Sequence, residues 1–216
     1  MRKDLIPITI VFFFLVILLL PMLLDWMGVL FDDYYETFSR LYFNARALQK
    51  GSICLWDPNT FAGGKINYIP NTRIWYWPAY LFYLFSPVSS VNGTYTALIK
   101  IPLLVHWFIA GLGAYWLGRR AIGINPPGAL ILSVVYSFGA AMTYNICDPS
   151  TVYATAWIPL AIGGIVVFAL KGRRWPGVMG ALAVSFIGPC GSEVRGVFSL
   201  VTVGLFLLFL SFFTLI

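Results

Sequence analysis

Two adjacent carboxylates, Asp32 and Asp33, are the residues of this sequence best placed to do chemistry, and they precede the aromatic pair Tyr34-Tyr35. Partial burial beside lipid would raise the pKa of a carboxyl group and make its carboxylate a usable proton acceptor. The pair could instead hold a phosphate or pyrophosphate through a divalent cation. The structural alternative is an N-cap followed by a first-turn charge that faces the positive end of a helix dipole.

Basic side chains accompany these acids along the following stretch and at the start of the next apolar run. A guanidinium fork matches the oxygens of a phosphate group, so these residues could bind a lipid phosphate. Ordinary contact with anionic headgroups accounts for them equally well, and a lysine at a helix end can also snorkel to the headgroups. The candidates for contact with a substrate phosphate or a lipid headgroup are Arg40, Arg46, Lys65, Arg73 and Lys100.

The single histidine, His106, lies in the middle of an apolar run beside Trp107. An ionisable group inside a membrane is a functional candidate by default, here as a ligand of a porphyrin-type metal. The alternative is a neutral imidazole that is hydrogen-bonded to a carbonyl of a neighbouring helix. No G-x-S-x-G, H-E-x-x-H or phosphate-loop motif occurs in the sequence. The odd set of cysteines has no C-x-x-C spacing and predicts neither zinc binding nor a disulfide framework, although one disulfide is allowed among Cys54, Cys147 and Cys190.

The composition that surrounds these residues is typical of a membrane protein. Hydrophobic residues make up 60% of the chain and charged residues 10%, and the mean hydropathy is +0.84. Eight Trp, 12 Tyr and 18 Phe suit a protein with two water–lipid interfaces. The net charge of +6 comes from scattered basic residues, which we interpret as membrane topology and contact with anionic headgroups. Binding to nucleic acid is not predicted.

The hydrophobic runs predict an all-α, polytopic fold with about six transmembrane helices in a single membrane domain over residues 1–216. The first run, 6–24, approaches the ~20 residues needed to span a bilayer and is not followed by a cleavage site, so 1–30 is predicted to be a signal anchor. About five further spans are predicted within 98–216, at 98–117, 128–147, 152–170, 176–189 and 197–216. The span 176–189 is short for a transmembrane helix.

Positive charge predicts how these spans are oriented. Three groups of basic residues fall on the same side of these spans: Arg2-Lys3, Arg119-Arg120 and the segment 171–174. The positive-inside rule assigns that side, and with it both termini, to the cytoplasm. Because the sequence stops at Ile216 within an apolar run, we expect an abbreviated chain.

Residues 31–97 are predicted to form a structured extracytoplasmic loop. Apolar residues recur at spacings of three and four from Tyr34 to Leu48, which predicts an amphipathic helix along the outer membrane surface. Asp33 with Glu36 is typical of a capping box at its start, and Gly51 is placed to end it.

Turns and a short apolar segment follow this helix. Segments 56–59 and 63–64 contain Trp56, Asp57, Pro58, Gly63 and Gly64 and are predicted to be turns. The aromatic segment 74–85 is too short to span and contains Pro78, so it is predicted to be interfacial or re-entrant.

This order of features resembles the YfhO-like bacterial membrane proteins, which belong to the GT-C class of polytopic glycosyltransferases. The shared pattern is a first membrane helix, an Asp-led, Tyr-rich helix, the motif G-x-x-x-L-W-[ND]-P-x-x-F-x-G-G and an aromatic-proline segment. Asp57 stands where that pattern more often has Asn. The residues that carry the resemblance are Asp32, Asp33, Tyr34, Tyr35, Gly51, Leu55, Trp56, Asp57, Pro58, Phe61, Gly63, Gly64, Pro78 and Pro87.

Weaker matches occur later in the chain. Segment 157–160 is similar to the family's W-x-P-L span start, and 188–191 stands at the place of its Gly-His-Pro turn but lacks the histidine. The resemblance covers nearly all of the 216 residues but only the amino-terminal part of the family's usual length.

The resemblance implies a protein of the bacterial cytoplasmic (inner) membrane that transfers a sugar from a polyprenyl-phosphate donor to a surface glycan or lipid. Asp32 or Asp33 would act as the base or the metal contact. The alternative is a non-catalytic structural or accessory transmembrane subunit of a larger membrane complex, derived from the same family, with lipid or pigment in grooves between its helices. A transporter is disfavoured because the chain has no internal repeat and few intramembrane charges.

Overall fold

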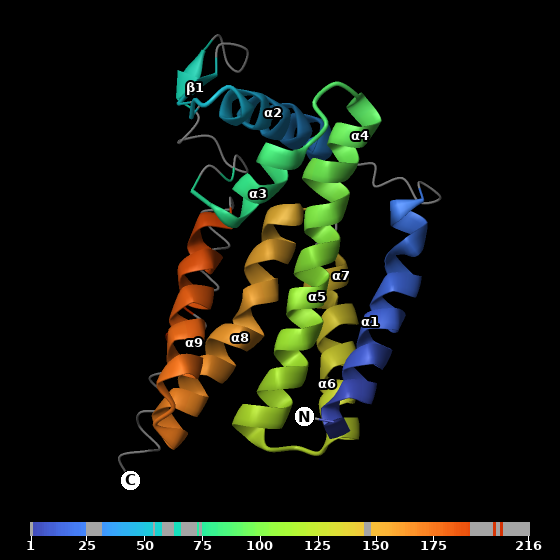
Figure 1. Cartoon of the computed structure of the whole chain (residues 1–216), viewed down its shortest axis with the longest axis vertical. Helices are drawn as coiled ribbons and strands as arrows, with labels where there is room; N and C mark the ends of the chain where they lie inside the picture. The colour runs from blue at the N-terminus through green and yellow to red at the C-terminus, as the bar shows by residue number, and fades with distance from the viewer. Residues whose placement is uncertain are drawn as a thin grey trace.

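Helices that run side by side form the body of the protein, and shorter elements cover one end of it (Figure 1). The computed structural model describes residues 2–24, 32–53, 55–57, 63–65, 73, 75–144, 148–190, 201 and 204. The main helices alternate in direction along the chain and are α1 (Arg2–Leu23), α5 (Ile101–Trp116), α6 (Pro126–Phe138), α8 (Pro149–Lys171) and α9 (Arg174–Ile187). The predicted helical fold is confirmed at this level.

Within the part of the chain that the structure describes, two helices are long and apolar enough to cross a membrane, Asn92–Ile122 and Pro149–Lys171. Shorter apolar helices cover Ile6–Ile17 and Pro126–Phe138. The first long helix combines α5 with three shorter pieces, which are α4 (Val91–Tyr95) and the π-helical segments η2 (Thr96–Lys100) and η3 (Leu117–Ile122). The last predicted span, 197–216, lies outside the described residues apart from 201 and 204.

The predicted span over 128–147 was wrong in one respect, because its helix is interrupted at Gly139. That residue is extended, with φ −66° and ψ 161°, and separates α6 from α7 (Ala140–Thr143). The interruption frees backbone carbonyls that a continuous helix would use. Trp107 of α5 satisfies one of them, since its indole Nε1 donates to the carbonyl of Ser137 over 2.7 Å.

The helices α8 and α9 pack closely because glycines face each other between them. A Cβ atom placed on Gly164 would lie 2.4 Å from the carbonyl oxygen of Pro176, and one on Gly180 would lie 2.9 Å from the backbone nitrogen of Ile165. Both distances are shorter than van der Waals contact, so only glycine permits this separation. The short connection turns at Gly172, whose φ is +63°.

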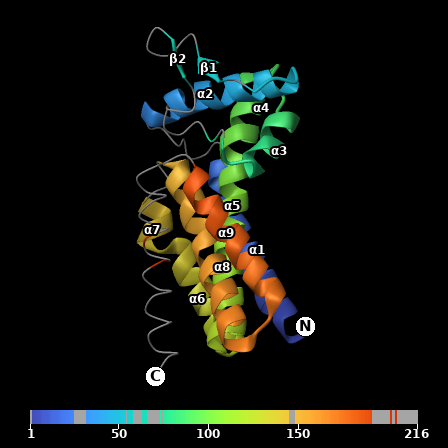
Figure 2. The same ribbon diagram turned by 90° about the vertical axis from the view of Figure 1, so that its left-hand side faces the viewer.

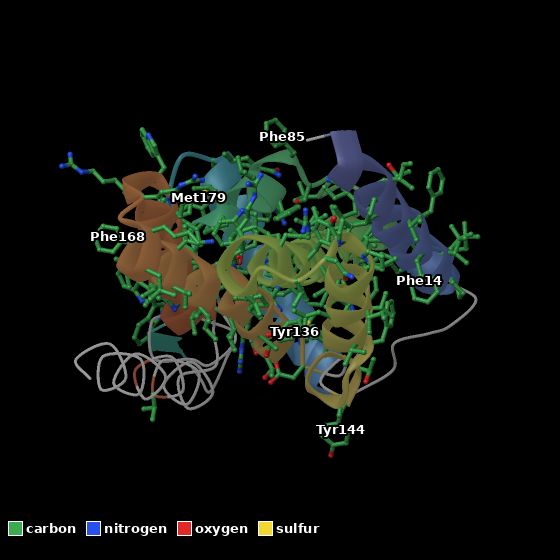
Figure 3. The ribbon with its side chains drawn as sticks, turned by 90° about the horizontal axis from the view of Figure 1, so that it is seen from below. Phe14, Phe85, Tyr136, Tyr144, Phe168 and Met179 are labelled. Carbon is green, nitrogen blue, oxygen red and sulfur yellow. The ribbon has the colours of Figure 1, made fainter. Side chains whose placement is uncertain are left out.

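Some large side chains of the bundle point outward, and others pack between the helices (Figure 3). Phe14 of α1 and Phe168 of α8 project from opposite flanks and are 41% and 50% exposed. Tyr136 lies between helices instead, where its hydroxyl donates to the carbonyl of Thr155 over 2.8 Å. An apolar outer surface of this kind suits a lipid environment.

Helix α2 (Asp32–Gln49) lies across one end of the bundle, as both ribbon views show (Figure 1, Figure 2). This confirms the predicted amphipathic helix, which buries Leu41 and Ala45 and leaves Arg46 exposed. The helix begins one residue before the predicted cap Asp33 and is followed by Gly51 with φ +76°.

Helix α3 (Pro78–Phe85) accounts for most of the segment predicted to be interfacial, and Pro78 occupies its first turn. The amide of Gln49 ties α2 to its end by donating to the carbonyls of Tyr83 and Ser86 over 2.8 and 2.9 Å. This contact supplies donors to carbonyls that the end of a helix leaves open.

The predicted turns at 56–59 and 63–64 need correction. Residues Trp56–Asp57 form strand β1, which pairs antiparallel with strand β2, Gly64–Lys65. The residues between the two strands that would form the turn, including Pro58, lie outside the described residues. The described part of the motif therefore contributes a short pair of antiparallel strands beside α2 (Figure 2).

The basic clusters lie at the end of the bundle opposite to α2 (Figure 1). Arg119 and Arg120 belong to η3, and the carbonyl of Arg120 accepts a hydrogen bond from Nζ of Lys171 at the end of α8. Helix α1 begins at Arg2 at this same end. These basic residues therefore gather at one end of the bundle.

Candidate functional site

A cluster of buried or half-buried polar and aromatic side chains joins α3 and the segment before it to α5 and α8. Tyr76 and Arg73 come from the segment before α3, and the other members come from the three helices. We call this set the polar cluster, and it consists of Arg73, Tyr76, Tyr83, His106, Tyr153 and Trp157.

A directional chain of hydrogen bonds runs through the polar cluster. His106 Nδ1 lies 2.6 Å from the carbonyl of Pro102, and Nε2 lies 2.5 Å from the hydroxyl of Tyr76. Because a carbonyl only accepts, Nδ1 carries the proton and Nε2 accepts from Tyr76. The Tyr76 oxygen in turn accepts from Nε1 of Trp157 over 2.8 Å.

This arrangement describes His106 as a neutral imidazole with both ring nitrogens engaged. The carbonyl partner belongs to Pro102, one turn earlier on the same helix, rather than to a neighbouring helix as the structural alternative expected. With both nitrogens in hydrogen bonds, the ring offers no lone pair to a metal in this conformation. The described residues also contain no group of three or more His, Cys, Asp or Glu that could hold a metal ion.

Arg73 and His106 meet at Tyr153. The rings of His106 and Tyr153 are stacked with their centroids 3.8 Å apart and their planes 11° from parallel. The guanidinium carbon of Arg73 lies 4.3 Å from the centroid of the same tyrosine, and its Nη1 donates to the tyrosine hydroxyl over 3.2 Å. Arg73 is only 3% exposed, so its charge is held inside the protein.

Arg73 also lines a narrow, closed crevice. Its Nε and Nη2 are buried and make no hydrogen bond with any residue that the structure describes. Apolar side chains form much of the crevice wall, from α3, η2 and the first turn of α5; they include Ala79, Phe82, Leu98 and Pro102. Buried donors without partners are rare in proteins because they lose their hydrogen bonds to water.

The titratable groups that the structure describes beside Arg73 do not neutralise its charge. Burial raises the pKa of Tyr76 and of Tyr83 well above the usual tyrosine range, and it also raises the pKa of the Cys190 thiol. The positive charge of Arg73 opposes this shift in each case, but burial outweighs it. All three groups therefore stay neutral near pH 7.

The predicted carboxylates open α2. Asp32 and Asp33 are its first two residues, and their side chains lie outside the described part of the structure. The backbone alone places them on the helix that crosses the end of the bundle (Figure 1).

The predicted phosphate contacts separate into different environments. Arg73 belongs to the polar cluster, whereas Arg46 is exposed on α2. Arg40 is buried on α2, and Lys100 is buried in η2 with Nζ 5.8 Å from the ring centroid of Tyr95. Lys100 is therefore directed into the protein and does not snorkel. The side chain of Lys65, in β2, lies outside the described part.

The residues of the two short strands and Gly63 have a structural role where they are described. Trp56 is 55% exposed, and a Cβ on Gly63 would lie 2.7 Å from its ring. Gly63 also has φ +105°, a conformation that residues with a side chain rarely adopt. Gly64 and Asp57 are paired across the two strands.

Comparison with known proteins adds no relative. The chain matches no protein-family model, no curated protein and no solved structure. The function proposed below therefore rests on the sequence and on the arrangement of the helices.

Sequence reasoning missed most of the polar cluster. Tyr76, Tyr153 and Trp157 lie in aromatic or apolar stretches, where such residues are expected as interfacial anchors or core. Tyr76 and Tyr153 are separated by 77 positions, so no local spacing connects them. Two members were candidates from the sequence: Arg73, as a cation in the polar loop, and His106, since a lone imidazole in an apolar run requires polar partners.

Proposed function

We propose that this protein is a multi-pass membrane protein similar to YfhO-like proteins of the GT-C class, and that it transfers a sugar from a polyprenyl-phosphate donor to a surface glycan or lipid. The observation that carries this proposal is the position of α2. This helix begins with Asp32-Asp33 and lies across the end of the bundle opposite to the basic clusters. The positive-inside rule favours the outer face of a membrane for that end.

The proposed topology is that of about six spans in the bacterial cytoplasmic membrane, with both termini in the cytoplasm. Its support is the alternating direction of α1, α5, α6, α8 and α9 together with the grouping of basic residues at one end. Positive charge flanking short loops is the strongest determinant of orientation in such proteins.

In the proposed reaction, Asp32 or Asp33 accepts the proton of the acceptor hydroxyl. The hydroxyl oxygen then bonds to the anomeric carbon of the sugar. The bond between that carbon and the donor phosphate breaks, and the phosphate oxygen leaves with the electron pair. The same carboxylates would be the ligands of a divalent cation that neutralises the phosphate, if the reaction uses one.

The test replaces Asp32 and Asp33, one at a time, with asparagine and measures transfer of labelled sugar from a polyprenyl-phosphate donor in isolated membranes. We expect at least one variant to lose activity by about 100-fold or more, as removal of a general base commonly does. Asp4→Asn, which makes the same chemical change at the opposite end of α1, is the matched control. Unchanged transfer and unchanged surface glycans in both variants would contradict the proposal.

The second candidate is a structural or accessory subunit of a larger membrane complex. Two observations favour it: the hydrogen bonds of His106, Tyr76 and Trp157 are satisfied within the protein, and α9 exposes a run of large apolar side chains that includes Trp175 and Met179. This function predicts stoichiometric co-purification with other membrane subunits in mild detergent. Isolation as a monodisperse single chain would exclude it.

A further inference from the structure

We propose that the basic side chains at the junction of η3 with the connection between α8 and α9 form a binding site for anionic phospholipids. This junction lies at the end of the bundle opposite to α2 (Figure 1). The inference requires a membrane leaflet at that end and holds whether or not the protein transfers a sugar. We call this set of residues the basic surface, and it consists of Arg120, Lys171, Arg173 and Arg174.

The fold brings two distant parts of the chain together in the basic surface. Nζ of Lys171 donates to the carbonyl of Arg120, 51 positions away in the sequence. The chain then turns at Gly172 and places Arg173 and Arg174 next to the same junction. All four basic side chains are exposed, and a carbonyl partner does not neutralise the charge of the lysine.

Most acidic residues of the described helices and strands lie away from the basic surface. The acids of α2 and β1 are at the other end, and Asp148 caps the end of α8 that is opposite to Lys171. Two further acids, Asp25 and Glu193, follow the far ends of α1 and α9 in the chain. Asp4 of α1 belongs to the basic end, but two basic residues directly precede it. This end therefore has an excess of positive charge.

The stability of α9 does not explain the two arginines that open it. Arg173 occupies its N-cap position without a capping hydrogen bond from its side chain, and Arg174 is its first residue. The first turn contains no acidic residue. Because the start of a helix carries partial positive charge, two cations there are unfavourable for the helix itself. An anion bound beside them would offset this repulsion.

Apolar side chains next to the basic surface indicate that the anion belongs to a lipid. Trp175 directly follows Arg174 and is 79% exposed, and Phe168, three residues before Lys171, is 50% exposed and projects from the flank of the molecule (Figure 3). Exposed tryptophan is typical of the headgroup level, and basic clusters at that level attract anionic lipids. A phospholipid can contact the cations with its phosphate and the apolar side chains with its acyl chains, whereas a free phosphate ion contacts the cations alone.

The experiment measures the unfolding temperature of the full chain in a neutral detergent during titration with dioleoyl phosphatidylglycerol. A ligand that binds the folded protein raises this temperature, and the concentration dependence gives an apparent dissociation constant. We expect a rise with phosphatidylglycerol and a much smaller one with dioleoyl phosphatidylcholine, which has the same acyl chains and no net charge. Equal responses to the two lipids would overturn the proposal. Inorganic phosphate should have no effect, and an equal rise with it would overturn the assignment to a lipid.

Paired charge substitutions locate the binding. We expect Arg173→Gln combined with Arg174→Gln to weaken the binding of phosphatidylglycerol at least about tenfold, since each basic residue near anionic headgroups contributes a factor of about five. Arg46→Gln combined with Lys50→Gln removes the same charge from exposed positions of α2 and should bind as the wild type does. An equal loss in both double variants would mean that binding follows net charge. Undiminished binding in the first would mean that the lipid binds elsewhere, and either result would overturn the proposal.

Two further readouts separate lipid binding from a structural role. Without lipid, the variant that lacks both arginines should unfold at the same or a slightly higher temperature than the wild type, because these cations oppose the dipole of α9. A marked decrease would show that the arginines stabilise the fold and would overturn their assignment to a lipid site. Raising the salt concentration from about 0.05 M to about 0.5 M should weaken the binding of phosphatidylglycerol to the wild type, because salt screens exposed charges. Binding that does not change with salt would contradict the proposal. If the double variant cannot be isolated, Arg174→Gln alone decides, with an expected loss of at least about threefold.

Discussion

At the scale of single residues, Tyr76 connects the segments above the bundle to its helices. Its hydroxyl accepts from Trp157 of α8 and donates to His106 of α5 while the residue itself precedes α3. One side chain thus satisfies two buried polar groups on two different helices. Removal of such a hydroxyl destabilises the protein mainly because it leaves its buried partners without a hydrogen bond.

Replacement of Tyr76 by phenylalanine tests this role. The change leaves Nε1 of Trp157 and Nε2 of His106 without a partner, and we expect a loss of about 2 kcal/mol in the free energy of unfolding. For a protein of this size the unfolding temperature would fall by about 4–8 °C. Tyr144→Phe removes a hydroxyl from a side chain that is 82% exposed and should change the temperature little. Equal effects of the two substitutions would contradict the role of Tyr76.

At the scale of elements, the contact between α8 and α9 depends on the absence of side chains at Gly164 and Gly180. The backbones come so close that a Cβ on Gly180 would lie 3.1 Å from the carbonyl oxygen of Ala161. In a membrane, close packing of this kind gains van der Waals contact that apolar burial does not supply, because lipid is itself apolar.

We expect Gly180→Leu to separate these two helices. Backbone atoms cannot withdraw as a flexible side chain can, so the predicted cost is about 1–3 kcal/mol or more in the free energy of unfolding. Ala181→Leu adds a similar side chain at the adjacent, exposed position and should be tolerated. Thermal unfolding of both variants in the same detergent measures the difference, and equal stability would show that the two helices are not in close contact.

At the scale of the whole molecule, the two ends of the bundle differ in charge and in shape. One end carries α2 and α3, and the other carries Arg119, Arg120 and the connection between α8 and α9 (Figure 2). The proposed function requires the first end to lie outside the cytoplasm, because lipid-linked sugars for surface glycans are used there.

Cysteine labelling in intact cells tests this orientation. In a background without Cys54, Cys147 and Cys190, we expect Arg46→Cys on α2 to react with a membrane-impermeant maleimide. Arg174→Cys, at the other end, should react only after permeabilisation, because basic residues remain in the cytoplasm. Both positions are exposed in the structure, so burial does not account for a difference. The reverse pattern would place the predicted site in the cytoplasm and contradict the proposed function.

Helical periodicity was sufficient to predict α2, because its pattern arises from residues three and four apart that share one face. The interruption at Gly139 could not be predicted in this way. Apolar residues continue on both sides of it, and the carbonyl of Ser137 becomes acceptable there only because Trp107 of another helix donates to it. Hydropathy measures local composition and does not report such a distant partner.

The same reason separates Asp32 and Asp33 from Arg73. The two acids could be identified from the sequence because they are adjacent in the chain, and adjacency does not depend on the fold. Arg73 was one of five candidate cations, and only the fold placed it against Tyr153, whereas Arg40 and Lys100 are buried elsewhere and Arg46 is exposed.

The amino-acid sequence alone determined the helical character of this protein, its apolar surface and the grouping of its basic residues, because each depends on composition or on near neighbours. The tertiary structure decided which buried polar side chains come into contact. The segment before α3, the middle of α5 and the first half of α8 supply Tyr76, His106 and Tyr153, which are far apart in the chain and in contact only after the helices pack. Hydrogen bonds and desolvation act over a few ångströms in space, and the spacing of residues along a chain does not contain that distance.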